Sequence, residues 1–331
     1  MYETYYGLKE NPFNVTPDPK FIYLGEKHRE AFAHLLYGIR ENKGFIVLTG
    51  EVGTGKTTLI HYLLGQLNGD GTVKTAFLFN PKLSVEDFIK YVFKDLGVKI
   101  LGQSKGDYIR YFQSYLLNAY GLNVKVVLIV DEAQGLSPEL LEEIRLLSNL
   151  ETSKSKLLQI ILIGQPELDK TLYDESFRQI RQRINMRYHL PALSGKETKE
   201  YIEQRLRIAG AKKPILTEEA IKEIYRSSGG IPRLINILSD NSLLNGFAQD
   251  KKVVDKKSVK EAAKDLKLKR NSQRMWFWGL LWMGIIGAGL LGLYLYRSGN
   301  WLRLYKSLFS SLQTTYGILF NGLENVVRFF S

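Results

Sequence analysis

The glycine-rich octapeptide at residues 50–57 constrains the fold of this chain more than any other segment. It reads GEVGTGKT and fits the pattern G-x-x-x-x-G-K-[ST]. The apolar run GFIVLTG at 44–50 leads into it as a predicted strand, and a helical pattern at 57–67 follows it. In this context the backbone N–H groups of the loop turn toward phosphate oxygens, and the helix N-terminus adds partial positive charge. The segment therefore predicts a site for the phosphates of a nucleotide.

The residues of this loop have separate expected roles. Lys56 should reach the β- and γ-phosphates, and the hydroxyl of Thr57 should ligate Mg²⁺. The predicted nucleotide-binding residues of the loop are Gly50, Glu51, Val52, Gly53, Thr54, Gly55, Lys56, Thr57 and Thr58.

Polar residues end two further predicted strands. Asp131 and Glu132 close the run VKVVLIVDE at 124–132, at the edge of a parallel sheet where ligands bind. We expect Asp131 to position Mg²⁺ through its water shell and Glu132 to polarise the attacking water. Gln165 ends the fourth predicted strand, in IGQPEL. Its side chain either senses the γ-phosphate or orients water, or is simply a polar strand end.

The alternation of apolar strands and amphipathic helices predicts an α/β fold with a parallel sheet and helices on both faces. After residue 193 the predicted strands stop, and only helical patterns follow. We therefore expect a core at 1–193 and an all-helical lid domain at 194–268. The predicted strands are 44–50, 75–80, 124–132, 156–165 and 184–193; the predicted helices are 27–40, 57–67, 84–96, 107–119, 138–150, 195–209, 217–227, 231–248 and 257–267.

Arginines near the fifth strand and in the lid are further candidates. An arginine supplied by a neighbouring subunit can neutralise charge on a phosphoryl group in transfer, although a solvated basic face explains such a cluster equally well. Arg233 lies in GGIPRLIN, where glycine and proline mark a helix start, and either points back to the γ-phosphate or is an exposed helix residue. The cluster before and within the fifth strand consists of Arg178, Arg181, Arg183 and Arg187.

The net charge of +12 is concentrated near the C-terminus, where residues 251–274 hold ten basic and three acidic residues. Residues 275–296 carry no charge. A helix of that length reaches about 33 Å, enough for a hydrocarbon core of about 30 Å. Tryptophans crowd one end and tyrosines the other, as in an aromatic belt. We predict a transmembrane helix at 275–297, with a buried core helix as the alternative.

The charges around this span predict its orientation. More Lys and Arg precede it than follow it, which places the N-terminal side in the cytoplasm. The basic juxtamembrane segment 269–274 should attract anionic membrane lipids. The tail at 298–331 has the spacing of an amphipathic helix.

The chain has no cysteine, which excludes disulfides and thiolate metal sites, and its four histidines lack metal-ligand spacing.

Several motifs together resemble one known family. The segments YYGLKENPF, TPDPKFIYL, HREAFAHLLYGI, GEVGTGKTT, LIVDEAQ, LIGQPEL, QRINMRYHLPAL and GGIPRLIN occur in this order. Over residues 1–265 the chain resembles the AAA+ ATPases of the general secretion pathway, the ExeA/GspA type, which are related to ATPases that accompany exosortase and exopolysaccharide genes. The resemblance implies a P-loop AAA+ core that binds and hydrolyses ATP with Mg²⁺.

The resemblance also implies roles for individual residues. Asp131 and Glu132 match the Walker B pair, Gln165 the sensor-1 position, and Arg233 in GxPR the sensor-2 position. Arg183 best matches the arginine finger, with Arg178 as runner-up. Phe13 and Pro17 fall where such ATPases cradle adenine. The implied catalytic residues are Lys56, Glu132, Gln165, Arg183 and Arg233.

The resemblance implies a homo-oligomer with active sites at subunit interfaces, held at the bacterial inner membrane by one span. We expect hydrolysis to drive assembly or remodelling of an envelope or secretion complex through a membrane-protein partner. Only 35 residues follow Tyr296, too few for the periplasmic peptidoglycan-binding domain typical of the family. The alternatives are a DNA-associated regulator of the transposition type, although nucleic acid is an unexpected partner here, and a signalling scaffold that barely hydrolyses ATP.

Overall fold

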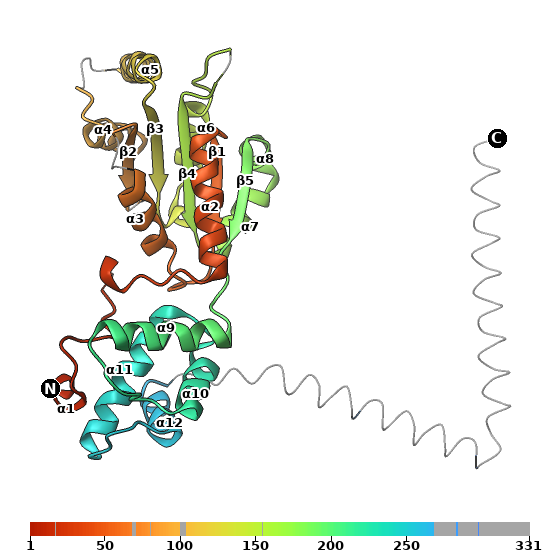
Figure 1. The fold of residues 1–331 in the computed structure, drawn as a ribbon. Coiled ribbons are helices and arrows are strands. Elements are labelled where there is room, and N and C mark those ends of the chain that lie inside the picture. The colour runs from red at the N-terminus through yellow and green to blue at the C-terminus, as the bar shows by residue number, and fades with distance from the viewer. Residues whose placement is uncertain are drawn as a thin grey trace. The chain divides into compact units, whose positions relative to one another are not determined.

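A computed structural model describes residues 1–16, 18–67, 71–79, 81–99, 104–153, 155–267, 283 and 297. Residues 1–270 form one compact unit, which contains a parallel sheet and a cluster of helices (Figure 1). Within the described residues, no helix combines the length and apolar character that a membrane span requires. The predicted span at 275–297, apart from two single positions, and the predicted segments 269–274 and 298–331 lie outside those residues.

The sheet has five strands in the order β2-β3-β4-β1-β5, and every neighbouring pair is parallel. The order places β1, which leads into the glycine-rich loop, between β4 and β5, with Leu48 opposite Ile163. The carboxyl ends of β1, β3 and β4 therefore meet at one edge. The strands are β1 (Phe45–Thr49), β2 (Val73–Leu78), β3 (Lys125–Val130), β4 (Leu158–Gly164) and β5 (Ile184–His189).

Helices cover both faces of this sheet, as the sequence predicted (Figure 1). Alternate residues of each strand point to opposite faces, so Ile46 and Leu48 pack with α2 and α3, whereas Phe45 and Val47 belong to the apolar cluster under α4, α5 and α6. The core helices are α2 (Glu26–Arg40), α3 (Lys56–Leu67), α4 (Val85–Asp95), α5 (Lys105–Gly121), η2 (Ala133–Gly135), α6 (Pro138–Leu147), α7 (Pro166–Tyr173), η3 (Glu175–Phe177) and α8 (Arg178–Arg181).

Short polar side chains fix where many helices begin. Ser104 and Ser194 each form a reciprocal capping box, with Asp107 and Glu197 respectively. These caps satisfy backbone N–H groups that the first helical turn leaves unpaired. The helical cluster consists of α9 (Gly195–Ile208), α10 (Glu218–Ser228), α11 (Pro232–Ala248) and α12 (Lys256–Asp265).

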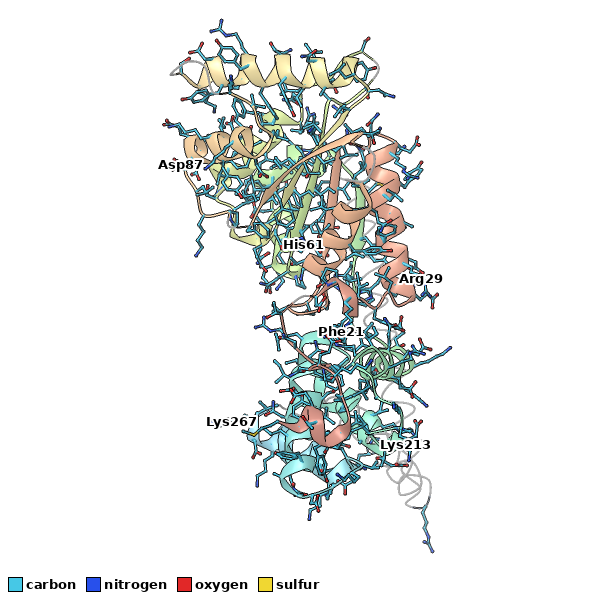
Figure 2. The ribbon with its side chains drawn as sticks, turned by 60° about the vertical axis from the view of Figure 1, so that its left-hand side comes forward. Phe21, Arg29, His61, Asp87, Lys213 and Lys267 are labelled. Carbon is cyan, nitrogen blue, oxygen red and sulfur yellow. The ribbon has the colours of Figure 1, made fainter. Side chains whose placement is uncertain are left out.

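The N-terminal segment packs against the helical cluster rather than against the sheet. It contains α1 (Tyr2–Tyr6) and η1 (Pro19–Phe21). Tyr2, Leu8 and Phe13 are buried in the apolar cluster of the lid helices, and so is Phe21, which is labelled in Figure 2. The predicted core at 1–193 includes this segment, because the division followed the order of the chain. The division at residue 193 stays a prediction.

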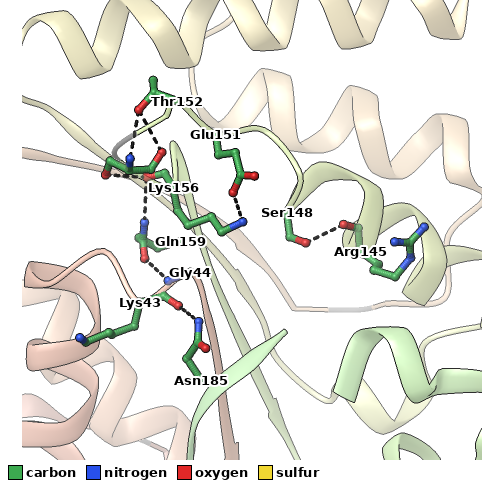
Figure 3. A network of polar contacts seen from close by, with 10 residues as sticks. Lys43, Gly44, Arg145, Ser148, Glu151, Thr152, Lys156, Gln159 and Asn185 are labelled. Carbon is green, nitrogen blue, oxygen red and sulfur yellow. Dashed lines mark hydrogen bonds and ion pairs between the residues drawn. The ribbon is translucent and has the colours of Figure 1, made fainter. Parts of the chain in front are cut away.

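A network of hydrogen bonds and ion pairs connects the amino ends of three strands, at the edge of the sheet opposite the glycine-rich loop (Figure 3). The buried side chain of Gln159 accepts a hydrogen bond from the Gly44 amide at 2.7 Å and donates one to the Lys156 carbonyl at 3.4 Å. Lys156 pairs with Glu151, and Asn185 donates to the Lys43 carbonyl. These contacts tie β1, β4 and β5 together where the strands begin.

The expected helices and strands are present, with ends displaced by a few residues. The fifth strand ends at His189 rather than at residue 193, because Pro191 lacks the N–H that would extend the ladder. The sequence did not predict α7, η3 or α8 between β4 and β5. They contain eight, three and four residues, too few to produce a helical period.

Candidate nucleotide site

A cavity of about 410 Å³ lies between the carboxyl edge of the sheet and the helical cluster. The loop 52–58 forms its floor, and Glu132 lines it from the end of β3, which β4 separates from β1. The N-terminal segment and the lid helices complete it, through Asn14, Phe21 and Arg233 among others. The cavity therefore joins a phosphate-binding loop to a pocket built by distant parts of the chain.

The glycine-rich loop has the backbone that its sequence predicts. Gly53 and Gly55 have φ values of 82° and 97°, in the region that favours glycine. A Cβ at Gly53 would also lie 2.7 Å from the Cβ of Arg233, so the lid approaches the loop closely there. The Arg233 amide donates to the Gly53 carbonyl at 3.2 Å, which joins the first turn of α11 to the phosphate loop.

Lys56 is buried at the start of α3, with 7% of its surface exposed. Its ammonium group donates to the carbonyls of Gly50 and Glu51 at 2.7 and 3.0 Å. Burial lowers the pKa of Lys56, and the negative charges of Glu132 and Asp131 oppose that change. The side chain is thus held over the loop, within the cavity that phosphates would enter.

Thr57 and Asp131 are brought together from opposite sides of the site. The Thr57 hydroxyl donates to Oδ2 of Asp131 at 2.7 Å, and the Glu132 amide donates to Oδ1 of Asp131 at 2.9 Å. Two oxygen ligands beside a phosphate loop fit the preference of Mg²⁺, which keeps water and phosphate oxygens in the rest of its shell. The described residues contain no group of three or more His, Cys, Asp or Glu side chains that could cage a metal by themselves.

Glu132 lines the cavity and is the second residue after β3. It is an exposed residue in the left-handed region, with φ at 51°. The amide group of Gln165 donates to its Oε2 at 3.2 Å, and that of Gln134 donates to the same oxygen. The two predicted residues Glu132 and Gln165 are therefore in direct contact.

The opposite end of the cavity is built by the N-terminal segment and two lid helices. Arg205 is buried, donates to the Pro12 carbonyl and, at 3.4 Å, to the Asn14 carbonyl, and lies 4.8 Å from the centre of the Phe21 ring. Asn236 donates to the same Asn14 carbonyl at 3.3 Å. These contacts fix residues 12–14 beside the cavity, and the three residues Asn14, Val15 and Thr16 line it.

Of the two predicted adenine contacts, Phe13 is not where the sequence suggested, and Pro17 stays a prediction. Phe13 is 1% exposed and packs in the apolar cluster of the lid helices, so its ring does not line the cavity. Pro17 lies outside the described residues. The segment carrying both residues does border the cavity, because Phe13 anchors it in the lid.

Of the candidate arginines, Arg233 alone is brought to this cavity. Arg183 directly precedes β5, and the first residue of β5 pairs with Phe45, the first residue of β1. It is therefore placed at the edge of the sheet opposite the phosphate loop, where its charge contributes to lowering the pKa of Glu151 after the larger effect of Lys156. Arg178 is exposed at the start of α8.

Three residues of the site were not predicted. His28 on α2 is buried, and its Nε2 lies 3.0 Å from the Thr54 carbonyl in the loop. Arg205 lies on a helix that reads as an ordinary charged amphipathic helix. Gln134 stands within the motif LIVDEAQ, which was the one available signal.

Comparison with known proteins agrees with this geometry. The AAA domain family matches residues 39–172, which include the phosphate loop, Asp131, Glu132 and Gln165. The chain is 45% identical over 257 residues to the general secretion pathway protein A of Aeromonas hydrophila, a match that covers 75% of this chain and 45% of that protein. The expected resemblance is confirmed, and the chain spans less than half the length of that relative.

Solved structures share the fold of about three quarters of this chain. The Orc2 protein of Aeropyrum pernix in its ADP form is 18% identical, with a TM-score of 0.56 over 76% of this chain and 71% of that one. Cdc6p of Pyrobaculum aerophilum is 17% identical, with a TM-score of 0.57 over 75% and 70%. At these identities the likeness shows a shared α/β fold and nothing beyond it.

Proposed function

We propose that this chain binds MgATP in the cavity beside the glycine-rich loop and hydrolyses its terminal phosphoryl group. The observation that carries this proposal is the meeting of Thr57 with Asp131 at 2.7 Å, next to Glu132 and below Lys56. These are the cation ligands, the base and the phosphate-binding ammonium that phosphoryl transfer needs. The site residues assigned from the sequence keep their proposed roles, Phe13 excepted.

Each side chain has a step in this reaction. Lys56 would exchange the carbonyls of Gly50 and Glu51 for phosphate oxygens, which are stronger acceptors for an ammonium group. Thr57 and Asp131 would hold Mg²⁺, which would supply positive charge to neutralise the phosphates. Glu132 accepts a proton from a water whose oxygen bonds to the γ-phosphorus, while the bond from that phosphorus to the β–γ bridging oxygen breaks. Arg233 and Gln165 would contact the terminal phosphate from the lid and the sheet.

The proposed arginine finger acts on a neighbouring subunit. Arg183 and the phosphate loop lie at opposite edges of the sheet, separated by strands of five or six residues. At about 3.3 Å per residue that distance exceeds the reach of an arginine side chain. Arg183 therefore cannot serve the cavity of its own chain, and a homo-oligomer would bring it to the next one.

We further propose that the chain is held at the bacterial inner membrane and that hydrolysis drives assembly or remodelling of an envelope secretion or export complex. Support comes from the uncharged segment 275–296 and from the 45% identity to a general secretion pathway protein. A membrane-protein partner and anionic lipids would be its contacts there.

The test is ATP turnover by the full chain in detergent micelles, measured against protein concentration. We expect turnover per molecule to rise with concentration in the wild type and to be lost in Arg183→Ala. Arg207→Ala, which changes an exposed lid arginine, is the matched control. Arg178→Ala tests the runner-up in the same assay. Turnover per molecule that is independent of concentration and of both arginines would contradict a shared site.

One observation also favours a DNA-associated role. Lys257, Lys260 and Lys264 are exposed on α12, and their spacing places them on one helix face. Such a face binds anionic surfaces, either lipid or DNA. Binding of the full chain to duplex DNA that weakens steeply with salt would favour the regulator, whereas binding to anionic vesicles alone favours the membrane role.

A further inference from the structure

Gln134 occupies the space between the ends of β3 and β4. It lies in the short helix η2, two residues after Glu132, and its side chain is half-buried. Its amide nitrogen donates to Oε2 of Glu132, and its amide oxygen accepts the backbone N–H of Gln165 at 3.0 Å. One side chain thus connects the candidate base to the strand end that carries Gln165.

The backbone of Glu132 has a conformation that neighbouring contacts must maintain. A residue other than glycine with φ at 51° is held there by its surroundings. Gln134 and Gln165 both donate to Oε2 of this carboxylate. Because both amides use the same oxygen, the second oxygen, Oε1, is the one left to take a proton from water.

The absence of a side chain at Gly164 leaves space for the side chain of Gln134. Gly164 ends β4, and a Cβ on it would lie 2.9 Å from the amide oxygen of Gln134 and 2.8 Å from a methyl carbon of Leu168. Any larger residue would push Gln134 away from the Gln165 amide. The close approach of these two segments therefore requires the glycine at 164.

From these contacts we propose that Gln134 is a positioning residue for hydrolysis. Its side chain holds the Glu132 carboxylate at a fixed position relative to the backbone N–H of Gln165. The proposed base, Glu132, and the proposed γ-phosphate contact, Gln165, therefore keep one geometry. The proposal rests on the proposed function, since it gives Glu132 the role of base. Gln134 bonds to Glu132 and Gln165 but does not line the cavity, so it should affect the chemical step and not nucleotide affinity. Displacing a reacting group by about 1 Å can lower a rate by about 100-fold.

The experiment compares Gln134→Met, which keeps the shape and removes both hydrogen-bonding groups, with Gln134→Glu, which places a second carboxylate beside Glu132. In the full chain we expect kcat for ATP to fall about 10- to 100-fold in both variants, while the Kd for a fluorescent ATP analogue stays within about twofold. Gln182→Met, at an exposed glutamine after α8, should leave kcat and Kd unchanged. Normal kcat in both Gln134 variants, or a matching loss of nucleotide affinity, would overturn the proposal.

A double-mutant cycle separates this inference from the function on which it rests. Single-turnover rates are measured for Glu132→Gln, for Gln134→Met and for the double variant. If Gln134 acts through Glu132, the double variant is no slower than Glu132→Gln alone. If Gln134→Met slows both backgrounds equally, the positioning role is wrong although the base assignment stands. If Glu132→Gln turns over like wild type, the base assignment fails, and the positioning role fails with it.

Discussion

The two ends of the nucleotide cavity are built in different ways. At the phosphate end, Lys56 and Thr57 are adjacent in sequence and lie on the same helix start, and Asp131 directly follows β3 of the same sheet. At the opposite end, Asn14 is held by Arg205 and Asn236, which are more than 190 residues further along the chain. The first end is a local motif placed by a sheet, whereas the second depends on tertiary packing.

This difference has a physical cause. Phosphate recognition uses backbone N–H groups and fixed residue types, so any chain that performs it must contain a similar short pattern. Enclosing the rest of a nucleotide needs only a surface of suitable shape, which many residue combinations provide. The comparison predicts that changes at the phosphate end abolish binding, and that changes at the other end weaken it and also destabilise the fold.

The largest effect should come from Lys56→Ala. Loss of the ammonium group removes a charge-assisted contact to the phosphates, and we expect nucleotide affinity to fall by about 100-fold or more. Titration of the full chain with a fluorescent ATP analogue measures this. Lys43→Ala, at the opposite edge of the sheet beside the Tyr37 ring, should bind normally. Equal affinity of Lys56→Ala and wild type would show that the cavity binds its ligand without the loop.

A smaller effect on binding, joined to a loss of stability, should follow from Arg205→Met. The variant keeps the apolar stem but removes hydrogen bonds to two carbonyls and the contact with the Phe21 ring. We expect a loss of about 2–4 kcal/mol in the free energy of unfolding. Nucleotide affinity should fall about tenfold, because residues 14–16 are no longer fixed.

Denaturant unfolding and the same nucleotide titration test both parts of this prediction. Arg207→Met, two residues further on the exposed face of α9, is the matched control and should change neither quantity. An Arg205 variant that is as stable as wild type and binds normally would remove the proposed difference between the two ends of the cavity.

The smallest effect concerns His28, which borders the phosphate loop from α2. Burial lowers the pKa of His28, while the Thr54 carbonyl and the charge of Glu197 oppose this change to a lesser extent. Below the unfolded pKa of about 6.5 the unfolded chain therefore binds a proton that the folded chain does not, and the free energy of unfolding falls as the pH falls. Each unit of pKa difference corresponds to about 1.4 kcal/mol.

His28→Gln keeps an N–H donor that can reach the Thr54 carbonyl but does not titrate. Its free energy of unfolding should depend less on pH between about 5 and 7 than that of the wild type. Denaturant unfolding at several pH values measures both slopes. Identical slopes for the two proteins would mean that His28 does not contribute to the acid sensitivity of the fold.

The sequence was sufficient for the layered fold because each strand is a continuous apolar run and each long helix has a clear period. It also identified the chemical groups at the carboxyl edge, since Lys56, Asp131 and Glu132 follow strands or a loop of known pattern. It failed for Phe13, which the family resemblance placed beside adenine but which is buried in the apolar cluster of the lid helices. It also missed Arg205, because nothing in α9 shows that a segment near residue 12 will pack over it.

The fate of ATP on Glu132→Gln shows whether Glu132 is the base that activates water. We predict that this variant binds MgATP as tightly as wild type but retains it uncleaved, because the phosphate loop is intact and the base is gone. Labelled ATP incubated with the full-length variant should be recovered as ATP, whereas wild type returns ADP and phosphate. Recovery of ADP from Glu132→Gln at the wild-type rate would contradict the assignment of Glu132 as the base that activates water.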